Sequence, residues 1–303
     1  MNDNISIINW FPGHMAKAKR EIIEKIKMVD LVIELKDARI PYSSSNPMIK
    51  EIIGNKPRLI LLCKSSIADP KVTALWMNYY ASQNILALDI DSITNYHTSS
   101  IIKYAKMALK ETFEKRKAKG VLSEQIKAII LGIPNVGKST LINTLAKRKA
   151  TQVGDRPGVT KNQTWIKITP DLLLLDTPGI LWPKFEDQAV GVKLAMCGSI
   201  KDEILNLEEI SAKAIEYIGA NYPDYLKNRY NLDEIFEDPY VNLENIAIKR
   251  GFLLKGGIPD INKVCIIFLN ELRGNKIGAM SYERPSEIEW NKWYIFIWRT
   301  IIW

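Results

Sequence analysis

One eight-residue segment, Gly132-Ile-Pro-Asn-Val-Gly-Lys-Ser139, constrains the fold more than any other part of the chain. It matches the pattern GxxxxGK followed by Ser or Thr, it follows an apolar run at Ala128–Leu131, and it opens a helical pattern at Lys138–Leu145. In that context, backbone N–H groups of the loop and of the helix N-terminus bind phosphates. The segment predicts a P-loop in which Lys138 reaches the β- and γ-phosphates and the Ser139 hydroxyl ligates Mg²⁺.

Two further segments fit the phosphate side of the same site. Asp176-Thr-Pro-Gly179 follows the apolar run Leu172–Leu175, so its carboxylate is expected to hold the Mg²⁺ shell and the Gly179 N–H to approach the γ-phosphate. Thr160 ends the Gly- and Pro-containing stretch 154–160 between these motifs. A Thr at that position suits a switch loop that closes on Mg²⁺ and the γ-phosphate.

The first 180 residues alternate short apolar runs with helical patterns, and several runs are apolar on both faces, as in a covered parallel sheet. The runs predicted as strands are Leu31–Leu35, Arg58–Leu62, Ile85–Ile90, Ala128–Ile133, Thr164–Ile168 and Leu172–Leu175. This alternation predicts an α/β domain with a doubly wound, mostly parallel sheet over residues 1–182. Residues 183–286 read as a helical domain, and residues 287–303 form a Trp-rich tail of unknown role.

Composition narrows the function classes. The three cysteines, Cys63, Cys197 and Cys265, are far apart and the chain has only His14 and His97, so a zinc enzyme or a disulfide scaffold is not expected. No apolar run reaches the roughly 18–20 residues of a membrane span and no secretory signal is visible, so we expect a cytoplasmic protein. The net charge of +8 permits a polyanionic partner.

The order of the motifs points to a permuted chain. In ordinary GTPases the guanine-reading motif, NKxD or TKxD, follows the P-loop and the switches, but no such segment follows Asp176. The segment Cys63-Lys64-Ser65-Ser66 instead lies upstream, directly after the predicted strand Arg58–Leu62. Base reading would then come first, the P-loop second and the switches last, which is the order of a circularly permuted GTPase.

Four segments resemble the ribosome biogenesis GTPase A family, and the resemblance runs from about residue 7 to 286. They are the opening WFPGHMAKAKR at 10–20, DARIP at 37–41 with Ser43–Pro47, the P-loop with its internal Pro-Asn, and DTPGILWPKFED at 176–187. The resemblance implies a potassium-stimulated GTPase that acts late in assembly of the large ribosomal subunit. It implies that the C-terminal helical domain helps to bind this particle of rRNA and ribosomal proteins. We expect a monomer with no DNA partner.

The resemblance also implies a ligand set for GTP, Mg²⁺ and K⁺. Asn135 occupies the position that helps to place K⁺ against the phosphates, and Ser139, Thr160 and Asp176 surround Mg²⁺. The residues expected to contact the nucleotide are Cys63, Lys64, Ser65, Ser66, Asn135, Val136, Gly137, Lys138, Ser139, Thr140, Thr160 and Gly179.

The base-reading segment departs from the family pattern, because Ser66 stands where NKxD has its Asp. That Asp accepts two hydrogen bonds from guanine, each worth about 1.5–3 kcal/mol, so its loss predicts roughly 10²- to 10⁴-fold weaker GTP binding and selectivity. Asp69 is a possible substitute, but its Asp-Pro context favours a helix cap. The next family motif, which normally contains a Ser, is also eroded near Asp89-Ile90.

Catalysis needs a group from outside the usual position. Ile180 follows the switch glycine where many GTPases have the Gln that orients water, so turnover by the chain alone is expected on the order of 10⁻³ s⁻¹ or less. The resemblance makes His14 the candidate that swings toward the γ-phosphate on the ribosomal particle and orients water or acts as a base. A role for His14 in a turn or an RNA contact is the alternative.

Basic clusters agree with an RNA partner, although each alone is typical of a solvated face. Lys103, Lys106 and Lys110 are predicted to share one helical face. One alternative function stays open, a non-hydrolysing RNA-binding assembly factor with a degenerate base site, and Cys63 and Ser66 favour it. An ATPase with relaxed base selectivity is a third.

Overall fold

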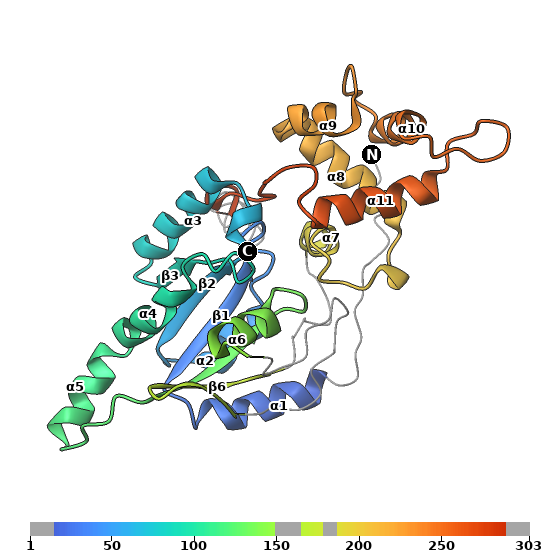
Figure 1. Ribbon diagram of the computed structural model, residues 1–303. Helices are drawn as coiled ribbons and strands as arrows, with labels where there is room; N and C mark the ends of the chain where they lie inside the picture. Colours follow the sequence, from blue (N-terminus) through green and yellow to red (C-terminus); the bar gives the residue numbers. More distant parts are fainter. Residues whose placement is uncertain (1–14, 149–164, 178–186, 289–303) are drawn as a thin grey trace, which may run out of the picture. The chain divides into compact units, whose positions relative to one another are not determined.

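The computed structural model describes residues 15–148, 165–177 and 187–288 (Figure 1). The chain divides into two compact units, one formed mainly by residues 184–282 and the other by residues 10–183 together with residues from 283 on. The helical domain expected from the sequence spans residues 183–286, so its limits differ from those of this unit at residue 183 and at residues 283–286, which group with the sheet.

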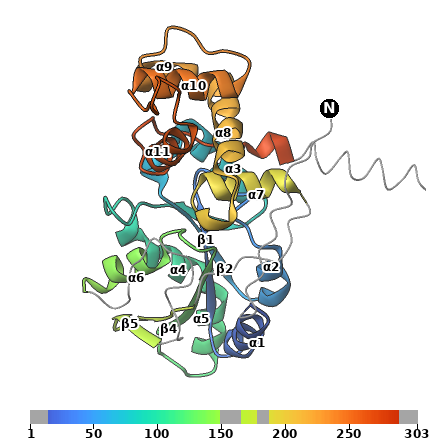
Figure 2. The same ribbon diagram turned by 90° about the vertical axis from the view of Figure 1, so that its right-hand side faces the viewer.

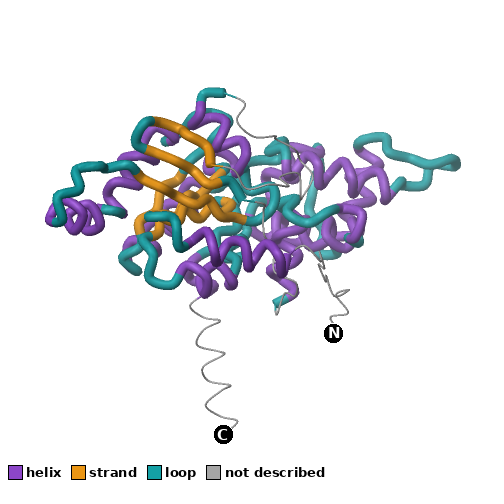
Figure 3. Tube along the Cα trace, turned by 90° about the horizontal axis from the view of Figure 1, so that it is seen from below, coloured by secondary structure: helices purple, strands orange, loops and turns teal. Residues whose placement is uncertain are grey.

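The sheet unit contains one six-stranded sheet, and all strands of the described chain lie in it (Figure 3). In sheet order the strands are β3 (Leu86–Asp89), β2 (Arg58–Cys63), β1 (Leu31–Asp37), β4 (Ile126–Gly132), β6 (Leu172–Leu175) and β5 (Trp165–Thr169). Every neighbouring pair is parallel except β5 and β6, which form an antiparallel edge. The predicted fold class, a mostly parallel doubly wound sheet, is confirmed.

Helices lie on both faces of this sheet, as parallel strands require. They are α1 (Met15–Ile26), α2 (Pro47–Ile53), α3 (Pro70–Ser82), α4 (Ile101–Ala108), α5 (Lys110–Ala118) and α6 (Lys138–Ala146). Figure 2 shows α6 on one side of the sheet and α1 and α2 on the other. The central strand β1 is therefore buried along its whole length: all seven of its residues are buried, the charged Glu34, Lys36 and Asp37 included.

Strand register brings the carboxyl ends of the strands to one edge. Asp37 at the end of β1 lies opposite Cys63 of β2, and Leu35 lies opposite Gly132 of β4. The strand order reverses between β1 and β4, since β2 and β3 extend the sheet one way and β6 the other. In open α/β sheets such a switch point is where ligands bind, and the fold places the P-loop and the predicted base-reading segment at this edge of the sheet.

Two helix predictions have different outcomes. The Asp69 cap is confirmed, because its carboxylate accepts hydrogen bonds from the backbone N–H groups of Lys71 (2.8 Å) and Val72 (3.4 Å) at the start of α3. The sequence pattern also predicts one helix from about His97 to Lys119, and this prediction is wrong, since α4 and α5 are separated at Leu109. Leu109 is fully buried with φ −102° and ψ 9°, so packing of this side chain accompanies a local departure from helical geometry.

The second unit is helical in its described part. It contains α7 (Gln188–Met196), α8 (Leu207–Asn221), α9 (Pro223–Tyr230), α10 (Pro239–Lys249) and α11 (Ile261–Arg273). Helix α8 packs against each of the other four, with Ile215, Leu243 and Phe268 among the buried side chains. Among the described residues, no helix has the length and apolarity to cross a bilayer.

The segment after the helical unit is anchored in the sheet unit through Glu283. Its carboxylate accepts hydrogen bonds from the Ser43 backbone N–H (2.9 Å), the Ser43 hydroxyl (2.7 Å) and the Tyr42 N–H. The Trp76 indole donates to the Glu283 carbonyl oxygen (3.1 Å). These buried contacts explain why residues beyond Tyr282 belong with the sheet.

Candidate nucleotide-binding site

The P-loop takes its shape from two glycines. A Cβ on Gly132 would lie 3.0 Å from Cγ1 of Val136 and 3.1 Å from Cβ of Leu35, so the close packing of the loop on β1 requires glycine there. Gly137 has a φ of 103°, a left-handed conformation that side chains rarely adopt. Helix α6 begins at the next residue, which places Lys138 and Ser139 in its first turn, where backbone N–H groups are available to an anion.

Lys138 and Asp176 face each other in this site. The Lys138 Nζ lies 3.6 Å from Oδ1 of Asp176, and both side chains are buried, at 7% and 3% exposure. Burial lowers the pKa of Lys138 to about 8, and the Asp176 charge offsets only part of this effect. Burial also raises the pKa of Asp176 against the opposing influence of Lys138. The pair is therefore poorly solvated, and polyanionic phosphates would add negative charge that favours the protonated form of Lys138.

The donor set fits Mg²⁺. Within the described chain, Oδ1 of Asp176 is buried and accepts no hydrogen bond. The adjacent Thr177 is held in place, because its hydroxyl donates to the Ile130 carbonyl oxygen of β4 at 2.6 Å. Mg²⁺ prefers hard oxygen ligands. The Asp176 carboxylate oxygen can still accept a donor or a cation, and Ser139, the residue after Lys138, carries a hydroxyl oxygen.

The Lys138 environment predicts how nucleotide affinity depends on pH. In the free protein Lys138 loses its proton above its pKa of about 8, whereas bound phosphates favour the charged amine and raise that pKa. GDP affinity should therefore fall as the pH rises above about 8, and binding there should take up a proton. Calorimetric titration with GDP in buffers of different ionisation enthalpy measures this uptake, and a value of zero near pH 8.5 would contradict the prediction.

The base-side lysine is positioned by a buried carboxylate. Lys64 has a left-handed backbone (φ 60°), and its Nζ lies 3.1 Å from Oδ2 of Asp37. The Arg39 guanidinium also donates to Asp37, through Nε (2.9 Å) and Nη2 (2.8 Å). Burial acts to raise the pKa of Asp37, but the charges of Arg39 and Lys64 outweigh it and hold that pKa well below its ordinary value. Asp37 is therefore an anion that fixes Lys64.

The rest of the base-side segment is tied to the loop after β3. The Ser65 N–H donates to the Ile90 carbonyl oxygen (3.1 Å), and the Ser66 hydroxyl donates to the carboxylate of Asp91. Cys63 is buried, with its Sγ 3.7 Å from the Leu61 carbonyl oxygen. Burial first, and then the nearby negative charges of Asp37 and Asp91, raise the pKa of the Cys63 thiol, so it stays protonated.

The predicted site residues fall into two groups. Lys64, the P-loop and Asp176 all follow strands whose carboxyl ends share one edge. His14, Thr160 and Gly179 lie outside the described residues. Sequence reasoning did not assign Asp37, Thr177 or Asp91 to the site. Each residue had a signal in the sequence. Asp37 begins the DARIP segment, Thr177 is the second residue of DTPG, and Asp91 is a carboxylate two residues after Asp89.

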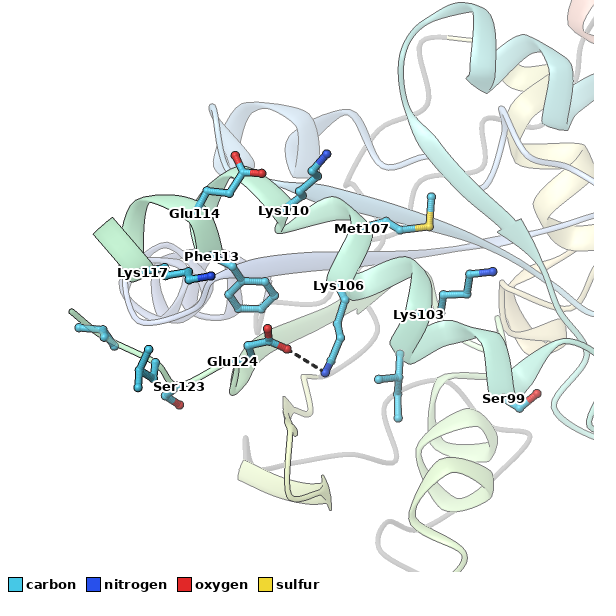
Figure 4. A pocket seen from close by; sticks show the side chains of 13 residues that line it. Ser99, Lys103, Lys106, Met107, Lys110, Phe113, Glu114, Lys117, Ser123 and Glu124 are labelled. Carbon is cyan, nitrogen blue, oxygen red and sulfur yellow. Dashed lines mark hydrogen bonds and ion pairs between the residues drawn. The ribbon is translucent and has the colours of Figure 1, made fainter. Parts of the chain in front are cut away.

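A basic groove lies on α4 and α5, separate from these residues. It has a volume of about 980 Å³ and is lined by Lys103, Lys106, Lys110 and Lys117 with the apolar Met107 and Phe113 (Figure 4). Across the groove the Lys106 ammonium pairs with the Glu124 carboxylate at 3.1 Å. The lysines predicted to share one helical face therefore line one concave surface.

The site and fold together define a class of protein. A P-loop after β4, an aspartate after the neighbouring β6 and a base-side segment that precedes both in the chain are the parts of a circularly permuted P-loop GTPase. A family profile described as "50S ribosome-binding GTPase" matches residues 127–234.

Relatives identify the family. Ribosome biogenesis GTPase A of Priestia megaterium is 53% identical over 283 residues, covering 93% of this chain and 98% of that protein. The Bacillus cereus protein of the same name is 50% identical over 281 residues, 93% and 95% of the two chains. A GDP-bound YlqF structure (27% identity, TM-score 0.63, 88% and 100% covered) and the GNP-bound YlqF from T. maritima (28%, 0.61, 89% and 98%) share the fold. The chain belongs to the ribosome biogenesis GTPase A family.

Proposed function

We propose that this chain hydrolyses GTP during late assembly of the large ribosomal subunit, slowly by itself and faster on the pre-ribosomal particle. The observation that carries the proposal is the buried Lys138–Asp176 pair beside the P-loop: among the described residues Oδ1 of Asp176 accepts no hydrogen bond, and phosphates with a cation would supply partners to both side chains. Such groups position and neutralise the transferred phosphoryl group. Membership of the ribosome biogenesis GTPase A family supports the ribosomal partner.

In this proposal Ser139, Asp176 and Thr160 hold Mg²⁺, which neutralises charge on the phosphates when bound. Asn135 helps to place K⁺. Its left-handed backbone (φ 58°) is compatible with a tight turn whose backbone carbonyl and side-chain amide oxygens face an ion. His14 orients the attacking water on the particle. The basic groove on α4 and α5 offers ammonium groups to rRNA phosphates, and such contacts should weaken steeply as salt rises.

The experiment is a GTPase assay with and without purified large subunits from a strain that accumulates late precursors, in K⁺ and in Na⁺ buffer. We expect turnover on the order of 10⁻³ s⁻¹ or less for the chain alone and clear stimulation by the particle in K⁺. His14→Ala should bind GTP and the particle as the wild type does but lose the stimulation. Particle binding with no hydrolysis under any condition would favour the second candidate, an RNA-binding assembly factor, to which the substitutions at Cys63 and Ser66 point.

A further inference from the structure

A buried carboxylate lies beside the position where the base-reading aspartate is missing. Asp91 follows β3 and is 3% exposed. Two backbone hydrogen bonds between the segments of β2 and β3 set the position of Asp91. The Ile90 N–H donates to the Leu62 carbonyl oxygen (2.8 Å), and the Ser65 N–H donates to the Ile90 carbonyl oxygen (3.1 Å). These two bonds align the loop after β3 with the loop after β2, so that the Ser66 hydroxyl donates to Oδ2 of Asp91.

The two oxygens of Asp91 have different tasks. Oδ1 accepts hydrogen bonds from the backbone N–H groups of Ile93 (2.7 Å) and Thr94 (3.2 Å), which fixes the carboxylate in a tight turn. Oδ2 receives the Ser66 hydroxyl, and a carboxylate oxygen has room for a second donor. The Ser66 oxygen, whose O–H donates that hydrogen bond, still has lone pairs that can accept a hydrogen bond from another group. Two acceptors, one of them charged, therefore stand side by side.

The same loop is connected to the P-loop helix. The Thr144 hydroxyl of α6 donates to the Ser92 carbonyl oxygen at 3.0 Å, next to Asp91 in the chain. Thr144 lies in the last turn of α6, so this bond holds the loop after β3 against the helix whose first turn would bind the phosphates. Ser66 and Asp91 follow β2 and β3, whose carboxyl ends share the sheet edge with the P-loop. Lys64, held by Asp37 at 3.1 Å, flanks the same region.

We infer that Asp91 and Ser66 together read the guanine base, with the carboxylate on the loop after β3 instead of on the loop after β2. Oδ2 of Asp91 accepts from guanine N1–H, and the Ser66 oxygen accepts from the 2-amino group. Asp91 is then a specificity-determining residue that compensates for Ser66, and guanine selectivity survives the loss of the usual aspartate. The inference rests on the proposed GTPase function, since it needs the nucleotide in this site.

Asp69 does not offer this arrangement. Its carboxylate accepts the backbone N–H groups at the start of α3, which occupies it as a helix cap. Asp69 is nevertheless the first carboxylate after Lys64 in the chain, so Asp69→Asn is a matched control for Asp91→Asn. The control should fold normally, because Asn caps helices as well as Asp does.

The test is the binding of GDP, IDP, XDP and ADP to the wild type, Asp91→Asn and Asp69→Asn by equilibrium titration. Asn keeps the acceptor for Ile93 and Thr94 but replaces the charged oxygen with an amide that donates. Because a hydrogen bond to a charged group is the one lost, Asp91→Asn should bind GDP about 10- to 100-fold more weakly. XDP presents an oxygen in place of the 2-amino group, so its affinity for Asp91→Asn should fall far less than that of GDP, or should rise. Asp69→Asn should match the wild type for all four.

Each outcome decides one of two questions. A wild type that binds none of the four nucleotides would overturn the proposed function itself. A wild type that prefers GDP, with an Asp91→Asn variant whose GDP-to-XDP ratio is unchanged, would overturn only the role of Asp91. A second variant distinguishes loss of base reading from a folding defect. Ser66→Asp combined with Asp91→Ser returns the carboxylate to the loop after β2. It should bind GDP within a few-fold of the wild type, and a folded double variant as weak as Asp91→Asn would contradict the inference.

Discussion

Replacing Lys138 by Met should weaken GDP and GTP binding at least 100-fold. The Lys138 amine is buried beside Asp176 at the start of α6, so phosphates meet it in a poorly solvated site where its hydrogen bonds count fully. Losing two bonds that involve charged groups, at about 1.5–3 kcal/mol each, corresponds to at least this factor. Titration with a fluorescent GDP analogue measures the effect, and an affinity within threefold of the wild type would contradict the assignment of this loop.

Lys147→Met is the matched control, because Lys147 is an exposed lysine just beyond the other end of the same helix. It should leave nucleotide affinity unchanged. Lys138→Met has a second expected consequence. The Lys138 charge acts to lower the pKa of Asp176, so its removal should raise that pKa further and weaken Mg²⁺ dependence of any residual binding. Comparing residual affinity with and without Mg²⁺ separates this effect from the loss of the lysine itself.

Replacing Asp37 by Asn should lower the free energy of unfolding of the sheet unit by about 3–5 kcal/mol, the range for removing one partner of a buried ion pair. Asp37 is 1% exposed and pairs with Arg39, which is 2% exposed, so the variant removes one charged partner of a buried ion pair. Urea unfolding followed by Trp fluorescence reports on this unit, because residues 184–282 contain no Trp. GDP affinity should also fall, since Lys64 loses its 3.1 Å partner.

The pH dependence of this difference has a definite sign. The folded-state pKa of Asp37 lies below its ordinary value of 3.8, so its contribution is complete at neutral pH and is lost as the pH falls below that value. The gap between wild type and Asp37→Asn should therefore shrink on acidification. Glu111→Gln is the control, because the Glu111–Lys115 pair on α5 is exposed and its N–O distance is 4.0 Å. An Asp37→Asn variant as stable as Glu111→Gln would contradict the role given to Asp37.

The residues that follow strands were within reach of sequence reasoning. The predicted run Leu172–Leu175 has the bounds of β6, and the predicted run at Arg58–Leu62 differs from β2 by one residue. Glycine spacing and apolar runs report on local backbone geometry, which neighbouring residues decide. For the same reason the Asp69 cap was predictable, because an Asp-Pro pair acts on the turn that it begins.

The partners of those residues were decided by the tertiary structure. Ser66 and Asp91 are 25 residues apart, and they meet because β2 and β3 pair in one register; a shift by one residue would turn the side chains of β3 to the other face. The same holds for Asp37 and Lys64, and for Glu283, which returns to Ser43 across 240 residues. The sequence by itself determined where phosphate-binding chemistry begins. Which carboxylate lies beside which base-side residue depended on long-range strand register, because pairing between distant segments leaves no local pattern in the chain.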